Sequence, residues 1–238
     1  MEYIALVYGG FSAEAQISKK SANEIFNAFD TSIGQPILVR ITDKKWTAEF
    51  DSKEYSIDKN DFSFNTEEEK IVFKSVFNII HGTPGEDGKL AGYFDLLDIS
   101  YNSSNVLTSA LTSNKNWCNR FLSTYGIRVP KSVVFYKGED NSLLYSEIIY
   151  PCFVKPNNGG SSIGTHKVGN LLELETALKD AFRHDTEVIV EEFIQGREFS
   201  VGIVFNQGQE KVMPLTEIIV DSEFFDFKQK YSEKGATE

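Results

Sequence analysis

The stretch YIALVYGGFSAE, from Tyr3 to Glu14, decides how the first part of this chain is expected to fold. It opens with a short apolar run that ends at Gly9, a pattern typical of a strand buried on both faces of a parallel sheet. A helix is predicted after the glycine turn, because apolar residues then recur at spacings that share one helix face. These residues are Ile17, Ile25, Phe26 and Phe29.

The alternation of strand and helix continues through the first hundred residues. PILVRI (Pro36–Ile41) and SVFNIIHG (Ser75–Gly82) are predicted strands, and Lys89–Asp98 is a predicted helix. The intervening residues 43–70 are polar and mixed, with WTAEF and EYSID as candidate hairpin strands. Strands that alternate with helices over short connections form an open α/β layer, in which ligands bind beyond the carboxyl ends of the strands.

The second half of the chain follows a predicted domain boundary near Asn105. It begins with a predicted helix over Leu107–Tyr125 that ends at Gly126, followed by the extended stretch IRVPKSVVFY and a helix near Ser142–Ile149. The paired strands YPCFVKP and GTHKV come next, and then a helix over Leu171–Phe182. The last predicted elements are the strands EVIVEEFI and REFSVGIVFN, the turn NQGQ, and the strand KVMPLTEIIV, which continues the sheet.

The composition and charge of the chain limit the kinds of molecule that it is expected to bind. The chain has 24 basic and 35 acidic residues and a net charge of −11, with no basic block, which argues against a nucleic-acid partner. Cys118 and Cys152 form neither a C-x-x-C pair nor a cluster with histidine, so we expect two buried free thiols in a reducing compartment. Neither a signal peptide nor a run of 18 apolar residues is apparent, so we expect a cytoplasmic protein without a membrane partner.

VKPNNGGSSIG (Val154–Gly164) has the composition of a phosphate-binding loop. Lys155 ends a predicted strand, so its ammonium is aimed at a fixed point. The glycines leave backbone N–H groups open to phosphate oxygens, and Ser161 and Ser162 add hydroxyl donors. The common phosphate loop differs, because its lysine follows the glycines. We predict a flap that closes over phosphates; the alternative is a glycine-rich hairpin turn without a ligand.

Two loops of the first half lie where a ligand could bind. The Gly9-Gly10 turn allows close approach to a helix N-terminus. Ser12 and Glu14 follow it, but they could equally cap the helix and complement its dipole. His81 follows a buried strand, where a titratable ring can meet a substrate. The alternative is a hydrogen-bonded histidine in a turn.

The stretch VIVEEFIQGREFSV combines two apolar strands with three glutamates, Glu191, Glu192 and Glu198. Such a segment can lie beside an adenine, with backbone groups reading the edge of the base and a carboxylate accepting from the ribose hydroxyls. The alternative is an edge strand with solvated glutamates.

In this order, the motifs resemble those of the D-alanine–D-alanine ligases, which are ATP-grasp enzymes of cell-wall precursor synthesis. The shared series is GGxSxExxxS, HGxxGEDG, an NKxxxK/R-like helix (NKNWCNR in this chain), KPxxxGSSxG and ExFIxGREFSV, followed by FFDFKQKY. The resemblance covers nearly the whole chain, and its GEDG and GSSxG blocks are specific. In this family ATP phosphorylates one D-alanine to an acylphosphate, and the amine of a second D-alanine displaces the phosphate.

The resemblance also implies a fold. It is α/β, with an N-terminal Rossmann-like parallel-sheet domain over residues 1–105 followed by an ATP-grasp fold. The ATP-grasp fold comprises an α+β central domain over 106–190 and the start of an incomplete C-terminal domain over 191–238. In the family, the Asp, Glu and Asn ligands of two Mg²⁺ (or Mn²⁺) ions lie beyond the position of Glu238. We therefore expect no metal ligands up to that residue, poor binding of Mg²⁺–ATP and negligible turnover.

Roles in binding the first D-alanine are carried over to matching positions. Glu14 is expected to bind the ammonium of the substrate, and His81 to lie near its carboxylate. Ser161 and Tyr231 are expected to hydrogen-bond with Glu14 and so hold the flap and a second loop (FKQKYSEKGATE) over the site. Glu14, Ser161 and Tyr231 are thus the expected catalytic residues, and closure would keep water from the acylphosphate.

The remaining roles concern ATP. Lysines and a serine are expected at the phosphates, the segment Glu191–Ile194 at the adenine, and Glu198 at the ribose. The expected ATP-binding residues are Lys115, Lys155, Ser162, Glu191, Phe193, Ile194, Glu198 and Lys230. The resemblance further implies a homodimer.

Three alternatives stay open. A D-alanine–D-lactate ligase is disfavoured by Tyr231, because the resemblance places tyrosine there in dipeptide-forming members. Another ATP-grasp carboxylate–amine ligase is disfavoured by the HGxxGEDG block. The third alternative is a non-catalytic nucleotide-binding module.

Overall fold

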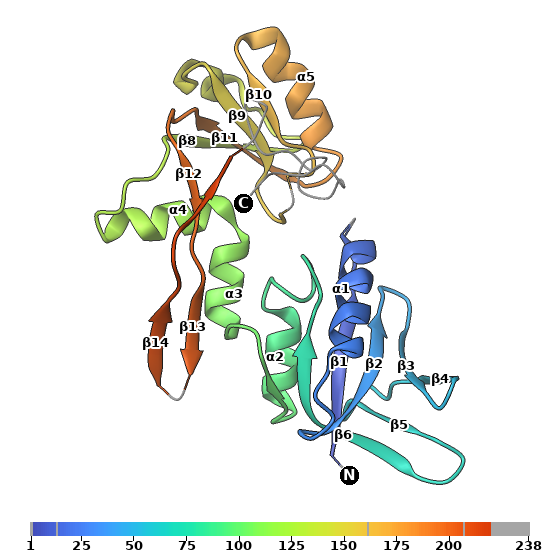
Figure 1. The fold of residues 1–238 in the computed structure, drawn as a ribbon. Helices are drawn as coiled ribbons and strands as arrows, with labels where there is room; N and C mark the ends of the chain where they lie inside the picture. The colour runs from blue at the N-terminus through green and yellow to red at the C-terminus, as the bar shows by residue number, and fades with distance from the viewer. Residues whose placement is uncertain (1, 13, 161, 207, 220–238) are drawn as a thin grey trace. The chain divides into compact units, whose positions relative to one another are not determined.

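The computed structural model describes residues 2–12, 14–160, 162–206 and 208–219 (Figure 1). The chain divides into two compact units, Met1–Cys118 and Asn119–Glu238. The finer division predicted at residues 105 and 190 stays a prediction. No helix within the described ranges is long and apolar enough to cross a membrane.

The first unit is built on a mixed sheet with the strand order β4-β3-β2-β1-β6-β5, and β7 pairs with β6. Its centre is parallel: β1 (Tyr3–Gly9) lies between β2 (Gln35–Ile41) and β6 (Lys70–Asn78). The short β7 (Ser100–Tyr101) is also parallel to its neighbour. The apolar run of β1 is central and buried on both faces, as the opening stretch predicts.

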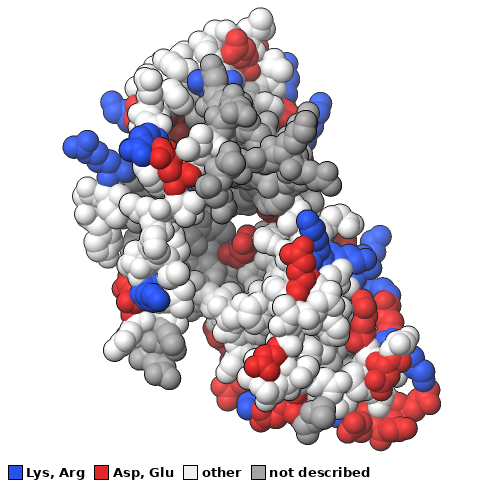
Figure 2. Space-filling view, in the orientation of Figure 1, with Lys and Arg blue, Asp and Glu red and all other residues white. Residues whose placement is uncertain are grey.

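The candidate hairpin is confirmed and extends the sheet at one edge. β3 (Trp46–Phe50) pairs antiparallel with β2 and with β4 (Lys53–Ser56), while β5 (Ser63–Asn65) pairs antiparallel with β6. Apolar side chains from these strands pack against α2 (Lys89–Leu96), around the fully buried rings of Phe62 and Phe64. Figure 2 shows acidic and basic side chains interspersed on the viewed face, and three ion pairs join this region: Lys45–Glu54, Lys53–Glu67 and Lys70–Asp61.

Helix α1 (Ala15–Asn27) lies against β1 and β2, as Figure 1 shows. Its buried residues are Ser18 and Ala22, and Ile25 and the following Phe29 join the same cluster. Phe26, predicted on this face, is 39% exposed, so that part of the prediction is wrong. The face is set by small residues, because only they allow the helix to approach the strand ends closely.

The single helix predicted over Leu107–Tyr125 is also wrong, because two helices occur: α3 (Val106–Ser113) and α4 (Lys115–Thr124). Asn114 between them has an extended backbone. Its side-chain oxygen accepts a hydrogen bond from Trp117 N at 3.0 Å. Asn114 therefore caps α4, which is a common use of asparagine at a helix start. Gly126 follows α4 with a φ of +74°, as expected for the residue that ends a helix.

The second unit contains an antiparallel sheet with the strand order β10-β9-β11-β8. Its strands are β8 (Ser132–Tyr136), β9 (Cys152–Pro156), β10 (His166–Val168) and β11 (Glu187–Glu192). Helix α5 (Leu171–Ala181) covers one face, and the predicted helix near residue 142 is a 3-10 helix, η1 (Ser142–Glu147). Alternate residues of β9 and β11 point into the core beneath α5.

The last predicted strands do not continue this sheet. REFSVGIVFN divides into β12 (Glu198–Ser200) and β13 (Ile203–Asn206), and the following stretch divides into β14 (Gln209–Val212) and β15 (Thr216–Ile218). β12 pairs with β15 and β13 with β14, as two separate ladders. Gly202 and Pro214 lie at the breaks, and proline cannot donate to a ladder.

Candidate functional site

In the first unit, Ser18 joins the carboxyl ends of two parallel strands. Its hydroxyl accepts from Gly9 N at 2.9 Å, at the end of β1, and donates to Ile79 O at 2.8 Å, just beyond β6. Ser18 is fully buried. The final serine of GGxSxExxxS is therefore structural, and it holds the two ligand-facing loops beside each other.

Glu14 lies in the space between these loops and is only 5% exposed. Ser12 Oγ accepts from Glu14 N at 3.2 Å and donates to His81 O at 3.1 Å. A Cβ atom placed on Gly82 would lie 2.9 Å from both Glu14 Oε2 and Ser12 Oγ. The structure thus brings together Glu14 and the backbone on either side of His81, as predicted for these loops, and only glycine fits at position 82.

The GEDG block shapes the loop that carries His81. Gly82 N donates to Glu86 Oε2 at 2.7 Å, and Asn78 Nδ2 donates to Gly85 O at 2.8 Å. Gly88 has a φ of +86° and precedes the first residue of α2. These glutamate and glycine residues therefore fix the backbone of the loop.

In the second unit, Lys155 and Glu191 lie on the sheet face opposite α5. Lys155 Nζ is 2.8 Å from Glu191 Oε2, and the two residues come from the paired strands β9 and β11. Asn119 Nδ2 donates to the other carboxylate oxygen, Oε1, at 2.7 Å. The Glu191 side chain is 8% exposed and that of Lys155 is 26% exposed, so the ammonium is the accessible end of the group.

Aromatic rings lie beside this pair. The centroids of Phe153 and Phe193 are 5.9 Å apart. Lys155 Nζ lies 5.0 Å from the centroid of Phe153, and Lys167 Nζ lies 4.3 Å from that of Phe193. Apolar rings with two nearby ammonium groups suit a flat base attached to a polyanion.

The glycine-rich stretch connects β9 to β10, as the predicted hairpin requires. Asn157 Nδ2 donates to Glu187 Oε2 at 2.6 Å, and Asn158 N donates to Asp185 Oδ2 at 2.7 Å. Gly164 has a φ of +66°, and a Cβ atom there would lie 2.7 Å from His184 Cδ2. The two asparagines and Gly164 therefore hold the two ends of the loop in place.

Other predicted site residues are less closely grouped. Ile194 and Glu198 are exposed, and Phe193 and Ser162 are half-buried. Lys115 is the first residue of α4 and belongs to the first unit. Ser161, Lys230 and Tyr231 lie outside the described residues.

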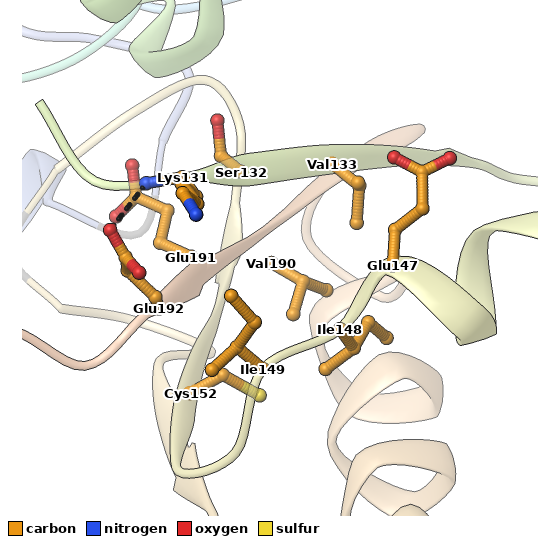
Figure 3. Close-up of a pocket in the computed structure, with 10 residues that line it drawn as sticks. All are labelled: Lys131, Ser132, Val133, Glu147, Ile148, Ile149, Cys152, Val190, Glu191 and Glu192. Carbon is orange, nitrogen blue, oxygen red and sulfur yellow. Dashed lines mark hydrogen bonds between the residues drawn. The ribbon is translucent and has the colours of Figure 1, made fainter.

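A pocket of about 340 Å³ lies on the α5 side of the second sheet (Figure 3). Its walls include Val133, Ile148, Cys152 and Val190, all of which belong to the core cluster beneath α5. Glu192 lies at one end, where its carboxylate accepts from Lys131 N at 2.9 Å. Cys152 is a buried free thiol, as predicted, and burial raises its pKa to about 11; Cys118 is also free but only half-buried, so its predicted burial is wrong. Glu191 and Glu192 also line the pocket, so it adjoins the end of β11 where the predicted adenine-binding segment begins.

The described ranges contain no group of three or more His, Cys, Asp or Glu residues that could hold a metal ion. The buried carboxylates of Glu14 and Glu191 lie in different units, and Glu191 is already neutralised by Lys155. These residues do not fit a Mg²⁺ site, which takes several oxygen ligands.

Sequence reasoning missed three residues of the second site: Asn119, Phe153 and Lys167. A period of two in YPCFVKP places Phe153 on the face of Lys155, so strand alternation could have identified it. The register of β10 with β9 then adds Lys167, which pairs with Phe153. Asn119 carried no local signal, because its partner is 72 residues away.

Comparison with known proteins agrees with this geometry. Residues 3–104 match the family model described as D-ala D-ala ligase N-terminus, and residues 121–238 match D-ala D-ala ligase C-terminus. A D-alanine–D-alanine ligase of Flavobacterium johnsoniae is 40% identical over 238 residues, covering 99% of this chain and 74% of that protein. One from Phocaeicola vulgatus is 41% identical over 232 residues, covering 96% of this chain and 72% of that protein.

Solved structures show the same similarity. The VanG D-Ala:D-Ser ligase of Enterococcus faecalis superimposes with a TM-score of 0.81 at 32% identity, covering 99% of this chain and 75% of that one. The Bacillus anthracis D-alanine–D-alanine ligase complexed with ATP gives a TM-score of 0.72 at 27% identity, covering 94% and 68%. These matches confirm the α/β and ATP-grasp expectation, and the chain belongs to the D-alanine–D-alanine ligase family.

Proposed function

We propose that this protein joins two D-alanine molecules to D-alanyl-D-alanine at the expense of ATP, for the synthesis of peptidoglycan precursors. The observation that carries the proposal is the match of both halves of the chain to the ligase models, with 40% identity to a ligase over the whole chain. The buried Glu14 beside the His81 loop supports it, because an amino-acid ligase needs an anion for the ammonium of its substrate.

The first substrate is held at the strand ends of the first unit. The carboxylate of Glu14 pairs with the ammonium of D-alanine, and His81 lies near the substrate carboxylate. That carboxylate attacks the γ-phosphorus of ATP, so an acyl–oxygen–phosphorus bond forms and ADP leaves. The role of the protein in this step is to position two anions and to offset their charge.

The second step consumes the acylphosphate. The amine of the second D-alanine attacks the carbonyl carbon, the tetrahedral intermediate collapses, and phosphate leaves as the peptide bond remains. Ser161 and Tyr231 are proposed to hydrogen-bond with Glu14 and to hold two loops over the site, which keeps water from the acylphosphate.

ATP is proposed to bind at the second-unit site. Glu191, Phe193 and Ile194 line the adenine, Glu198 accepts from the ribose, and Phe153 offers its ring. Lys155, Lys115, Lys230 and Ser162 contact phosphates, as point charges and a hydroxyl donor suit polyphosphate. Bound Mg²⁺ or Mn²⁺ would neutralise phosphate charge, and the described residues provide no site for it. We also propose a homodimer in the cytoplasm, on the family resemblance.

The test is an assay of D-alanine-dependent phosphate release with Mg²⁺ and ATP, made on a chain of the full length of its relatives, with the dipeptide identified by mass. Glu14→Gln should abolish release while ATP affinity stays within about twofold of the original, because the substitution removes the ammonium partner only. L-alanine serves as the negative substrate. Release that does not depend on D-alanine would refute the proposal.

A second candidate differs only in the second substrate. The similarity to a D-Ala:D-Ser ligase calls for a D-serine arm, and D-lactate tests ester formation. Mixed assays with limiting D-alanine and an excess of either compound separate the three products by mass. Faster formation of D-alanyl-D-serine than of D-alanyl-D-alanine would favour the second candidate.

A further inference from the structure

Asn119 makes a hydrogen bond to which the family motifs give no role. It lies on α4, is half-buried, and donates from Nδ2 to Glu191 Oε1 at 2.7 Å. Lys155 Nζ lies on the other oxygen at 2.8 Å. The Glu191 carboxylate is therefore held by one donor on each oxygen, from two elements that are far apart in the sequence.

Two donors on different oxygens fix the orientation of a carboxylate more completely than a single donor does. A carboxylate held at a single oxygen can rotate about its terminal torsion, which is broad and nearly free. With Asn119 on Oε1 and Lys155 on Oε2, both the position and the plane of the group are defined. Each oxygen keeps a second lone pair, so the fixed group can accept one further hydrogen bond.

An ionised carboxylate accepts hydrogen bonds but cannot donate them. It therefore favours a base that presents an amino group and disfavours one that presents a carbonyl oxygen. A base with a carbonyl oxygen at this position would leave two hydrogen-bond acceptors, that oxygen and the carboxylate, facing each other in a nearly buried site. The cost of such unpaired groups makes the site discriminate strongly between the two kinds of base.

We infer that Asn119 is a positioning residue for nucleotide specificity, which orients Glu191 so that the site accepts a 6-amino purine and rejects a 6-oxo purine. This inference rests on the proposed function, because it takes Glu191 to line the adenine. It adds a residue of α4 that does not itself touch the base.

The experiment compares equilibrium binding of ATP, ITP and purine riboside triphosphate, which carry an amino group, an oxygen and a hydrogen at position 6. Binding is measured by calorimetry on the original chain, Asn119→Ala, Asn119→Asp and the control Ser123→Ala. Asp keeps the size of Asn but replaces the amide donor with a carboxylate that faces Glu191. Ser123 lies one turn later on α4, and its hydroxyl donates only locally, to Arg120 O at 2.7 Å.

Asn119→Ala should weaken ATP binding about tenfold, the value of one hydrogen bond to a charged group, and change ITP binding by no more than about twofold. Asn119→Asp should show the same loss of selectivity, and Ser123→Ala should show none. Circular dichroism on each variant verifies folding. If Asn119→Ala unfolds, the nucleotide selectivity of Asn119→Asp tests the inference.

An equal loss for all three nucleotides would give Asn119 a merely structural role and overturn the inference. Unchanged ATP selectivity in both variants would do the same. Phosphate release with D-alanine on the same samples separates this outcome from failure of the proposed function. ATP-over-ITP selectivity that depends on Asn119, without D-alanine-dependent release, would refute the ligase assignment alone.

Discussion

Replacing Ser18 by alanine tests whether one buried hydroxyl holds the two substrate loops together. The hydroxyl accepts from Gly9 N at 2.9 Å and donates to Ile79 O at 2.8 Å, and it is fully buried. Alanine fills almost the same volume, so no large cavity forms. The substitution removes two hydrogen bonds and leaves a buried N–H and a buried carbonyl without this partner.

The expected loss of stability follows from these contacts. A buried group left unsatisfied costs about 1–3 kcal/mol, and there are two such groups. The higher helix propensity of alanine returns roughly 0.5 kcal/mol, because Ser18 lies within α1. We expect a net loss of about 1.5–5.5 kcal/mol in the free energy of unfolding, which lowers Tm by roughly 3–22 °C for a chain of this size.

Chemical and thermal unfolding measure this loss, with Ser21→Ala as the control. Ser21 lies on the same helix and is half-exposed, so its replacement reports helix propensity without the strand-end contacts. KM for D-alanine should rise in Ser18→Ala because the Glu14 and His81 loops are no longer tied. Stability within about 0.5 kcal/mol of the control would refute the reasoning, since surface changes alone produce effects of that size.

Three further predictions rest on single contacts. Lys155→Ala should weaken ATP binding by at least about tenfold in calorimetry, because it removes a charge-assisted contact, and unchanged affinity would make Lys155 structural. Gly82→Ala should raise KM for D-alanine with little change in ATP affinity, because its Cβ would lie 2.9 Å from Glu14 Oε2; an unaltered KM would contradict the placement of Glu14. Burial raises the pKa of the Cys152 thiol from 9.0 to about 11, so the unfolded chain ionises first as pH rises. Stability should therefore fall from pH 9 to 11, by up to about 2–3 kcal/mol more in the original protein than in Cys152→Ala, and identical pH profiles in denaturant titrations would refute this.

Much of the fold was predictable because the signals are local. The apolar run of β1, the hairpin of β3 and β4, and the pairing of β9 with β10 all follow from periodicity and turn residues. The errors came where local preference and tertiary packing differ. The predicted helix from residue 107 to 125 is interrupted, because the side chain of Asn114 caps a new helix instead of continuing the old one.

The site was predictable only in part, for a similar reason. Glu14 follows a glycine turn and His81 follows a strand, while Lys155 and Glu191 lie near the ends of β9 and β11, and such positions are readable from the chain. The buried face of α1 was predicted in part, because Ile25 and Phe29 join its cluster while Phe26 is 39% exposed. The most deeply buried residues of the helix, Ser18 and Ala22, are small, which the close approach of α1 to the strand ends requires.

By itself, the sequence determined the order of strands and helices, the glycine positions that ligands can approach, and membership of the ligase family. These features depend on local conformation and on motif order, and both are written along the chain. Only the tertiary structure decided which polar groups meet: Ser18 with the ends of β1 and β6, and Asn119 with Lys155 on the carboxylate of Glu191. Hydrogen bonds act over about 3 Å, so pairs distant in sequence form only when the packing of helices against sheets places them in contact.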